Sequence, residues 1–153
     1  MFARANFEAV RGFIGSDRGQ SMVELALTLP LMVFAILGGA DMARAFALQI
    51  AVENGSRAGA ESYAIDQTPT SAEAQAAAVA EINRTPTANA SASNVTVTKK
   101  QSDGVTACVS PPTIATPCYV SVRVQYPWST LIAWPLVPNG GTFDRTTSIR
   151  TFY

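Results

Sequence analysis

The sequence contains no histidine and few charged residues. Histidine is the commonest general base and the commonest metal ligand in proteins, so its absence removes the usual basis for both kinds of site. Charged residues make up 14% of the 153 residues, and the formal net charge is zero; soluble globular proteins carry roughly 25%. The chain therefore has no basic field that would attract nucleic acid.

The sequence also lacks the motifs of common catalytic sites. It contains no P-loop, no glycine-rich dinucleotide motif, no serine–histidine set and no clustered carboxylates. Two cysteines without histidine cannot form an ordinary zinc site. We therefore expect a protein that is not an enzyme and that needs no cofactor and no metal.

The two cysteines, Cys108 and Cys118, flank a proline-rich loop. In an exported domain this pair predicts a local disulfide, whereas in a reducing compartment it would remain as two free thiols.

An uncharged apolar run occupies residues 25–40. Together with residues 21–24 it is about 20 residues long, enough for a helix to cross the hydrocarbon core of a membrane. Three interpretations are open: a permanent anchor, a secretory signal cleaved after Ala40, or a buried core helix. The run is long for a signal sequence, and the remaining chain is small for enclosing such a helix, so the anchor is favoured. Pro30 is tolerated inside a membrane helix and can kink it.

The chain beyond the apolar run predicts a continuing helix and a separate domain. The expected organisation is a leader over residues 1–19, a transmembrane helix over 20–41, a helical continuation over 42–66, and an outer domain over 67–153. In the continuation, small residues repeat every four positions at Ala51, Gly55 and Gly59. Such a stripe lets another element approach closely, or it is simply the glycine-weakened end of a helix.

The outer domain combines a helix with a small sheet. A capping-box spacing of Thr70 and Glu73 predicts a helix over about residues 71–83. Alternating valines over residues 120–126 predict a strand that ends at Pro127, and further strands are expected near residues 95–97 and 143–152. The expected fold is α+β: a long N-terminal transmembrane and amphipathic helix, a short second helix and an antiparallel sheet of about three strands.

An apolar, proline-rich loop separates the last two expected strands, and a turn is expected at residues 139–141. Its large side chains are either part of the core or an exposed contact patch, and the core is favoured. These side chains are Trp128, Leu131, Ile132 and Trp134.

Glu24 is the one charged residue in the stretch of residues 20–40. A carboxylate at the edge of a membrane is costly and requires a reason. One possibility is that the Glu24 side chain extends to the membrane–water interface. The other is that Glu24 belongs to a pilin-like processing site, in which a charged leader ending at Gly19 is followed by a glutamate and an apolar helix.

The stretch of residues 19–63 combines a set of residues typical of one family: Gly19, Glu24-Leu25-Ala26-Leu27, Leu29-Pro30-Leu31, Gly38-Gly39, Asp41, Arg44, Ala45-Phe46, and Asn54 through Ser56-Arg57-Ala58-Gly59-Ala60. With these residues the stretch resembles the TadE-like family of minor pilins, or pseudopilins, of bacterial tight-adherence systems, and the resemblance extends to a pilin-like long N-terminal helix. This resemblance implies that a prepilin peptidase cuts after Gly19, that Gln20 becomes the N-terminus, and that Glu24 pairs with the N-terminal ammonium of a neighbouring subunit.

The resemblance further implies a single-pass protein of the bacterial inner membrane, with a cytoplasmic N-terminus and a periplasmic C-terminal domain, where the disulfide is favoured. Its expected role is a minor pilin in biogenesis of the tight-adherence (Flp-type) pilus, in the membrane or in the pilus itself. The implied partners are the major pilin, other minor pilins, the pilus secretion platform and the prepilin peptidase. The alternative is a generic single-pass envelope protein with a partner-binding periplasmic domain, for which Gly19 and Glu24 have no role.

Overall fold

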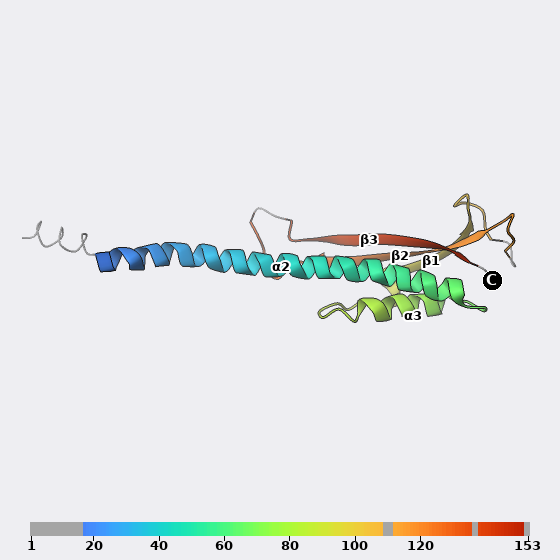
Figure 1. Ribbon diagram of the computed structural model, residues 1–153, viewed down its shortest axis with the longest axis horizontal. Helices are drawn as coiled ribbons and strands as arrows, with labels where there is room; N and C mark the ends of the chain where they lie inside the picture. The colour runs from blue at the N-terminus through green and yellow to red at the C-terminus, as the bar shows by residue number, and fades with distance from the viewer. Residues whose placement is uncertain (1–16, 109–111, 136–137, 152–153) are drawn as a thin grey trace, which may run out of the picture. The chain divides into compact units, whose positions relative to one another are not determined.

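The computed structural model describes residues 17–108, 112–135 and 138–151 (Figure 1). Most of the expected leader lies outside these residues. The elements are helix α2 (Asp17–Ile65), helix α3 (Ser71–Ile82), the short 3-10 helix η1 (Ala92–Asn94), and strands β1 (Val95–Gln101), β2 (Cys118–Ser129) and β3 (Gly140–Thr151). A long apolar helix, a short second helix and a three-stranded antiparallel sheet confirm the predicted α+β fold.

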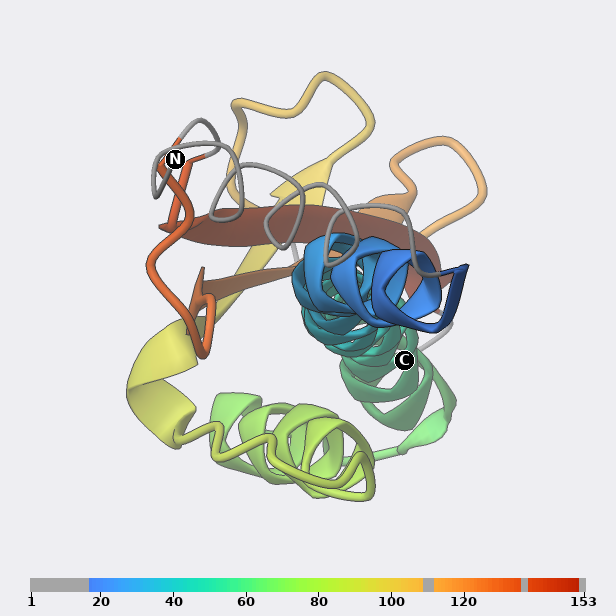
Figure 2. The ribbon, with the colours of Figure 1, turned by 90° about the vertical axis from the view of Figure 1, so that its left-hand side faces the viewer.

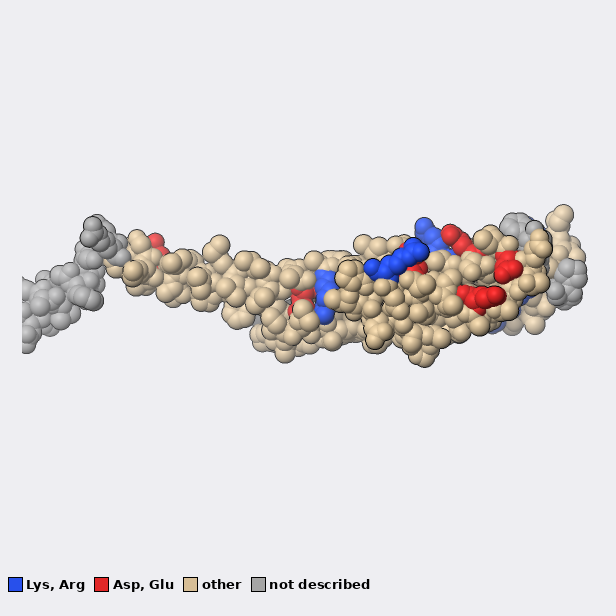
Figure 3. All heavy atoms as spheres, turned by 90° about the horizontal axis from the view of Figure 1, so that it is seen from below, with Lys and Arg blue, Asp and Glu red and all other residues tan. Residues whose placement is uncertain are grey.

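The chain divides into two compact units, Met1–Met42 and Ala43–Tyr153. In the first unit, the described part of α2 is an exposed apolar helix: Leu27 is 68% exposed and Leu31 is 70% exposed. Figure 3 shows few charged side chains on this part of the chain. Pro30 lies inside the helix without ending it. By length and composition, α2 is the one helix among the described residues that could cross a membrane.

The second unit, called here the C-terminal unit, is built on an antiparallel meander in strand order β1-β2-β3. The register pairs Val97 with Val122 and Val122 with Thr147, so these three residues share one face of the sheet. Figure 2 shows α3 and the C-terminal part of α2 on the same side of the sheet.

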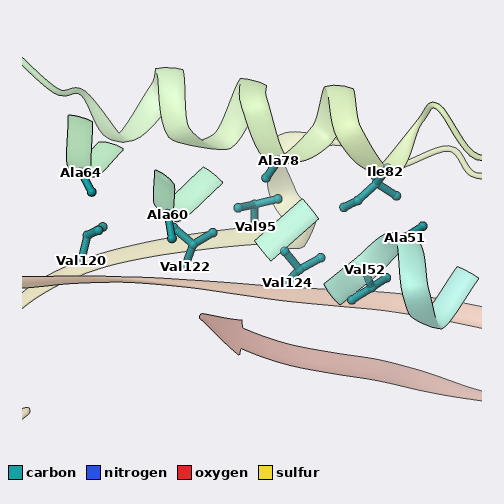
Figure 4. Close-up of a cluster of buried hydrophobic side chains, with 11 residues drawn as sticks. Ala51, Val52, Ala60, Ala64, Ala78, Ile82, Val95, Val120, Val122 and Val124 are labelled. Atoms are coloured by element: carbon teal, nitrogen blue, oxygen red, sulfur yellow. The ribbon is translucent and has the colours of Figure 1, made fainter. Parts of the chain in front are cut away.

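The core lies between these two helices and the sheet. Alternate residues of β2 are buried while Ser121 and Arg123 between them face away, as the period of two in the sequence predicts. In Figure 4 the valines of the sheet point toward small side chains of α2 and toward Ile82 of α3. The core residues are Ala51, Val52, Ala60, Ala64, Ala78, Ile82, Ala90, Val95, Val120, Val122 and Val124.

Helix α3 has the predicted capping box. The Thr70 hydroxyl accepts a hydrogen bond from the Glu73 amide at 3.2 Å, and the Glu73 carboxylate accepts one from the Thr70 amide at 3.2 Å. These two bonds satisfy amides that a helix start leaves without partners. At the other end, the Asn83 side chain accepts from the Ala90 amide at 2.7 Å and donates to the Ala90 carbonyl at 3.0 Å. This exchange fixes the connection that leads to β1.

The prediction that Pro127 ends its strand was wrong, because β2 continues to Ser129. Pro127 pairs with Thr142 of β3, whereas the pairing of β2 with β1 reaches only as far as Val124. The strand is therefore locally an edge at Pro127, where a missing amide hydrogen is tolerated. The turn expected at residues 139–141 does not extend over all three residues, because β3 already begins at Gly140.

The expectation that the apolar loop fills the core was only partly correct. Trp128 is half-buried and stacks on Phe143, with ring centroids 5.5 Å apart. Leu131 and Ile132, in contrast, are 74% and 37% exposed. They lie in the connection beyond the last paired residues of β2 and β3, where the sheet offers no face to pack against.

Candidate functional site

The expected processing site lies in the first turns of α2. Gly19, Gln20 and Glu24 are all helical, and the Gln20 side-chain amide donates to the Glu24 carboxylate at 3.3 Å. Thr28 donates its hydroxyl to the Glu24 backbone carbonyl at 2.9 Å. The Glu24 side chain is exposed on a helix whose next 16 residues carry no charge, from Leu25 to Ala40. A carboxylate on such a surface is costly to place at the edge of a membrane.

The small-residue stripe of Ala51, Gly55 and Gly59 is buried under α3. A Cβ on Gly55 would lie 2.5 Å from the Ile82 side chain, and a Cβ on Gly59 would lie 2.8 Å from the backbone oxygen of Ala74. Only glycine permits this approach of the helices. In this structure the stripe therefore receives an element of the same chain.

Ser56 connects α2 to the sheet and is fully buried. Its hydroxyl bonds to the Glu53 carbonyl at 2.8 Å and lies 2.8 Å from the hydroxyl of Thr147 on β3. The sequence pointed to Ser56 only through the family resemblance. Its role could have been predicted from its position, because Ser56 lies on the same helix face as Val52 and Ala60, which is expected to be buried. A buried hydroxyl requires a hydrogen-bond partner.

Arg44 makes a second link between α2 and the β2–β3 hairpin. Its guanidinium donates to the backbone carbonyl of Ser129, the last residue of β2. The two residues are 85 positions apart in the chain. No local pattern in the sequence indicates this contact.

A disulfide joins Cys108 to Cys118, with a Cα–Cα distance of 5.7 Å. It ties the loop after β1 to the first residue of β2. In the same loop, Asp103 accepts hydrogen bonds from the Thr106 amide at 2.9 Å and the Val105 amide at 3.0 Å. The hydrogen bond from the Thr106 side chain, followed by those from the backbone, holds the pKa of Asp103 below its usual value.

The outer face of the sheet is polar. The guanidinium of Arg123 forms an ion pair with Asp144, and Ser121 and Ser148 are joined by a hydrogen bond of 2.7 Å. A hollow of about 390 Å³ lies over this face, and its lining includes several hydroxyl side chains together with Lys100, Gln101 and Gly104. Among the described residues, no group of three or more side chains is arranged to hold a metal ion.

Among the described residues, one apolar helix that could span a membrane continues into a disulfide-bonded α+β unit, which defines the class of protein as a small folded domain on a candidate membrane helix. A sequence model of the TadE-like protein family matches residues 19–61, which confirms the resemblance over that segment. The matched segment contains Gly19, Glu24 and the stripe, and it ends before α3 begins. No curated protein and no solved structure matches the chain.

Proposed function

We propose that the chain is a membrane-anchored, minor pilin-like component of tight-adherence pilus biogenesis, acting by subunit–subunit interaction and catalysing no reaction. The observation that carries the proposal is the family match, which begins at Gly19 and includes an exposed glutamate on an apolar helix.

Glu24 is the recognition element in this proposal. An ionised carboxylate in an apolar environment is stable only beside a cation. Cleavage after Gly19 would create an ammonium group at Gln20, and this group on a neighbouring subunit would supply the missing charge. The attraction strengthens as water is excluded from between the helices.

Contacts between subunits are assigned to the exposed surface of α2, because the glycine stripe is already covered by α3. In the C-terminal unit, Phe46 and Ile50 lie one turn apart and are 64% and 60% exposed. Large apolar side chains exposed on one face are typical of a surface that packs against a partner. The proposed partners are the major pilin, other minor pilins and the secretion platform.

The proposed orientation places the N-terminus in the cytoplasm and the C-terminal unit in the periplasm. The prepilin peptidase would then cut after Gly19 at the inner membrane. The disulfide supports this orientation, because disulfides persist in the periplasm and are rare in the cytoplasm.

The first test is the intact mass of the protein purified from membranes with and without the prepilin peptidase. A chain that starts at Gln20 only when the peptidase is present supports the proposal. A chain that starts at Met1 in both cases supports the generic envelope anchor instead. A chain that starts at Asp41 would contradict membrane anchoring altogether.

The second test replaces Glu24. Glu24→Ala and Glu24→Gln should both impair piliation, because both remove the charge, while the protein still fractionates with the membrane, because the apolar run of residues 25–40 is unchanged. Thr28→Ala is the matched control, since it removes a hydrogen bond to the Glu24 carbonyl but leaves the carboxylate in place. Normal piliation in Glu24→Ala would exclude the proposed role of the glutamate.

A further inference from the structure

The hollow on the outer face of the sheet has the size and the chemistry of a small-ligand site. Its volume of about 390 Å³ lies within the range of roughly 300–1,000 Å³ found for ligand pockets. Its described lining combines aliphatic hydroxyls with one amide side chain, one aromatic ring and one lysine, and none of these residues is acidic. The aliphatic hydroxyls belong to Thr98, Ser102, Ser121 and Ser148.

One wall of the hollow is the loop after β1, which is held by its own hydrogen bonds. Gly104 in this loop has a φ of 73°, a left-handed conformation that glycine adopts without strain. The Gly104 amide donates to the Gln101 carbonyl at 3.0 Å, and the Gln101 amide donates to the Thr106 carbonyl at 2.9 Å. The Gln101 side chain donates to the Ala107 carbonyl at 3.2 Å. A wall that is fixed in advance loses little conformational entropy when a ligand binds.

A row of three residues across the sheet combines an aromatic ring with two cations. In the register Lys100 pairs with Tyr119, and Tyr119 pairs with Arg150. Directly paired residues of a sheet share one face, with Cβ atoms about 5 Å apart. Lys100 and Arg150 are exposed, and Tyr119 is half-buried. An anionic group bound beside Tyr119 is therefore within reach of two positive charges.

The acidic residues of the wall loop and of the outer face have partners outside this row. Asp103 accepts hydrogen bonds from the Val105 amide at 3.0 Å, the Thr106 amide at 2.9 Å and the Thr106 hydroxyl. Asp144 forms its ion pair with Arg123. Neither carboxylate lines the hollow.

We propose that the hollow binds an acidic sugar, a pyranose ring that carries a carboxylate, as one unit of a polysaccharide. The hydroxyls of the lining both donate to and accept from sugar hydroxyls. The ring of Tyr119 offers an apolar surface to the C–H groups of the sugar. Lys100 supplies a charge-assisted hydrogen bond to the carboxylate. The inference concerns the outer face of the sheet alone, and it requires neither membrane anchoring nor a role in a pilus.

The test is a titration of the full-length protein in zwitterionic detergent with trigalacturonic acid, followed by saturation-transfer NMR. The methyl ester of trigalacturonic acid has the same sugar rings without the charge, and inorganic phosphate has charge without a sugar. We expect the acid to bind and the ester to bind about tenfold more weakly. Added salt should weaken binding of the acid more than binding of the ester. Phosphate at the same concentration should not displace the acid.

Three variants identify the residues that bind. Lys100→Gln should weaken binding of the acid about tenfold and leave binding of the ester unchanged, because it removes the charge but keeps a polar side chain. Tyr119→Leu should weaken binding of both, because it removes the ring but keeps an apolar side chain. Lys99→Gln is the matched control and should bind like the wild type. Lys99 lies on the opposite face of β1, where its ammonium is 5.8 Å from the centre of the Tyr63 ring.

Four results would overturn the inference. They are no detectable binding of trigalacturonic acid, equal binding of the acid and its ester, an equal loss of affinity in Lys99→Gln and Lys100→Gln, and displacement of the acid by phosphate at the same concentration. The last result would show a simple anion site instead of a sugar site. None of these results bears on peptidase cleavage or piliation, so the proposed function is tested separately.

Discussion

Gly59 of α2 faces the backbone oxygen of Ala74 in α3 so closely that a Cβ at Gly59 would lie 2.8 Å from that oxygen. The same Cβ would lie 3.2 Å from the Val122 side chain on the sheet. The glycine thus sits where both helices and the sheet meet, and its missing side chain sets how closely they pack.

Gly59→Ala should destabilise the C-terminal unit by about 1–3 kcal/mol, because an added methyl group forces packed backbone apart. Gly39→Ala is the control, since nothing lies within 4 Å of a Cβ at that position. Thermal unfolding of both variants in detergent, followed by circular dichroism, measures the difference. An unfolding midpoint for Gly59→Ala equal to that of Gly39→Ala would contradict the close packing of α3.

Ser56→Ala should lower the free energy of unfolding by about 1 kcal/mol, because the Thr147 hydroxyl loses its partner across the core. Thr147→Val removes the other hydroxyl and should cost a similar amount. The double variant should be more stable than the sum of the two losses predicts, since neither hydroxyl is then left unpaired. Strict additivity in this double-mutant cycle, measured by chemical denaturation, would show that the two groups do not interact.

Replacing Cys108 and Cys118 by serine should lower the free energy of unfolding by about 2–3 kcal/mol, by the chain-entropy model for so short a loop. The cysteines close a loop with a sequence separation of 10. Reduction with dithiothreitol should lower the stability of the wild type and leave the serine variant unchanged. A wild-type protein that labels fully with a thiol reagent under native, non-reducing conditions would contradict the disulfide.

The ion pair of Arg123 and Asp144 should make stability depend on acid pH. The hydrogen bond from Arg123, assisted by its charge, holds the pKa of Asp144 below the usual 3.8. A carboxyl group whose pKa is lowered by folding stabilises the fold above its unfolded pKa, and this stabilisation is lost as the pH falls through the folded pKa.

Asp144→Asn should therefore lower the unfolding midpoint slightly at neutral pH and flatten its decline below pH 3.8. The effect is small because the pair is exposed to solvent and screened by it. Asp103, whose pKa is also lowered, remains as background in both proteins. The measurement is the unfolding midpoint of both proteins from thermal scans at a series of acid pH values. If the midpoint falls equally steeply with pH in wild type and variant, the ion pair does not contribute to stability.

Much of the fold follows from short-range patterns in the sequence. Thr70 and Glu73 start α3 because their side chains satisfy amides three residues away, and the alternating valines from Val120 to Val124 identify β2 and its buried face. The sequence also indicates the pairing of Cys108 with Cys118, since the two are close along the chain. In each case the residues that decide the structure are near neighbours.

The sequence by itself determined the apolar helix, the position of Glu24 on it, and the order of helices and strands, because helical and strand periods and charge are local properties. Only the tertiary structure decided that α3 covers Gly55 and Gly59, that Ser56 meets Thr147, and that Leu131 stays exposed. These outcomes depend on which distant residues share a surface: Ser56 and Thr147 are 91 positions apart. Contact across such distances arises from the packing of whole elements, and no single segment encodes it.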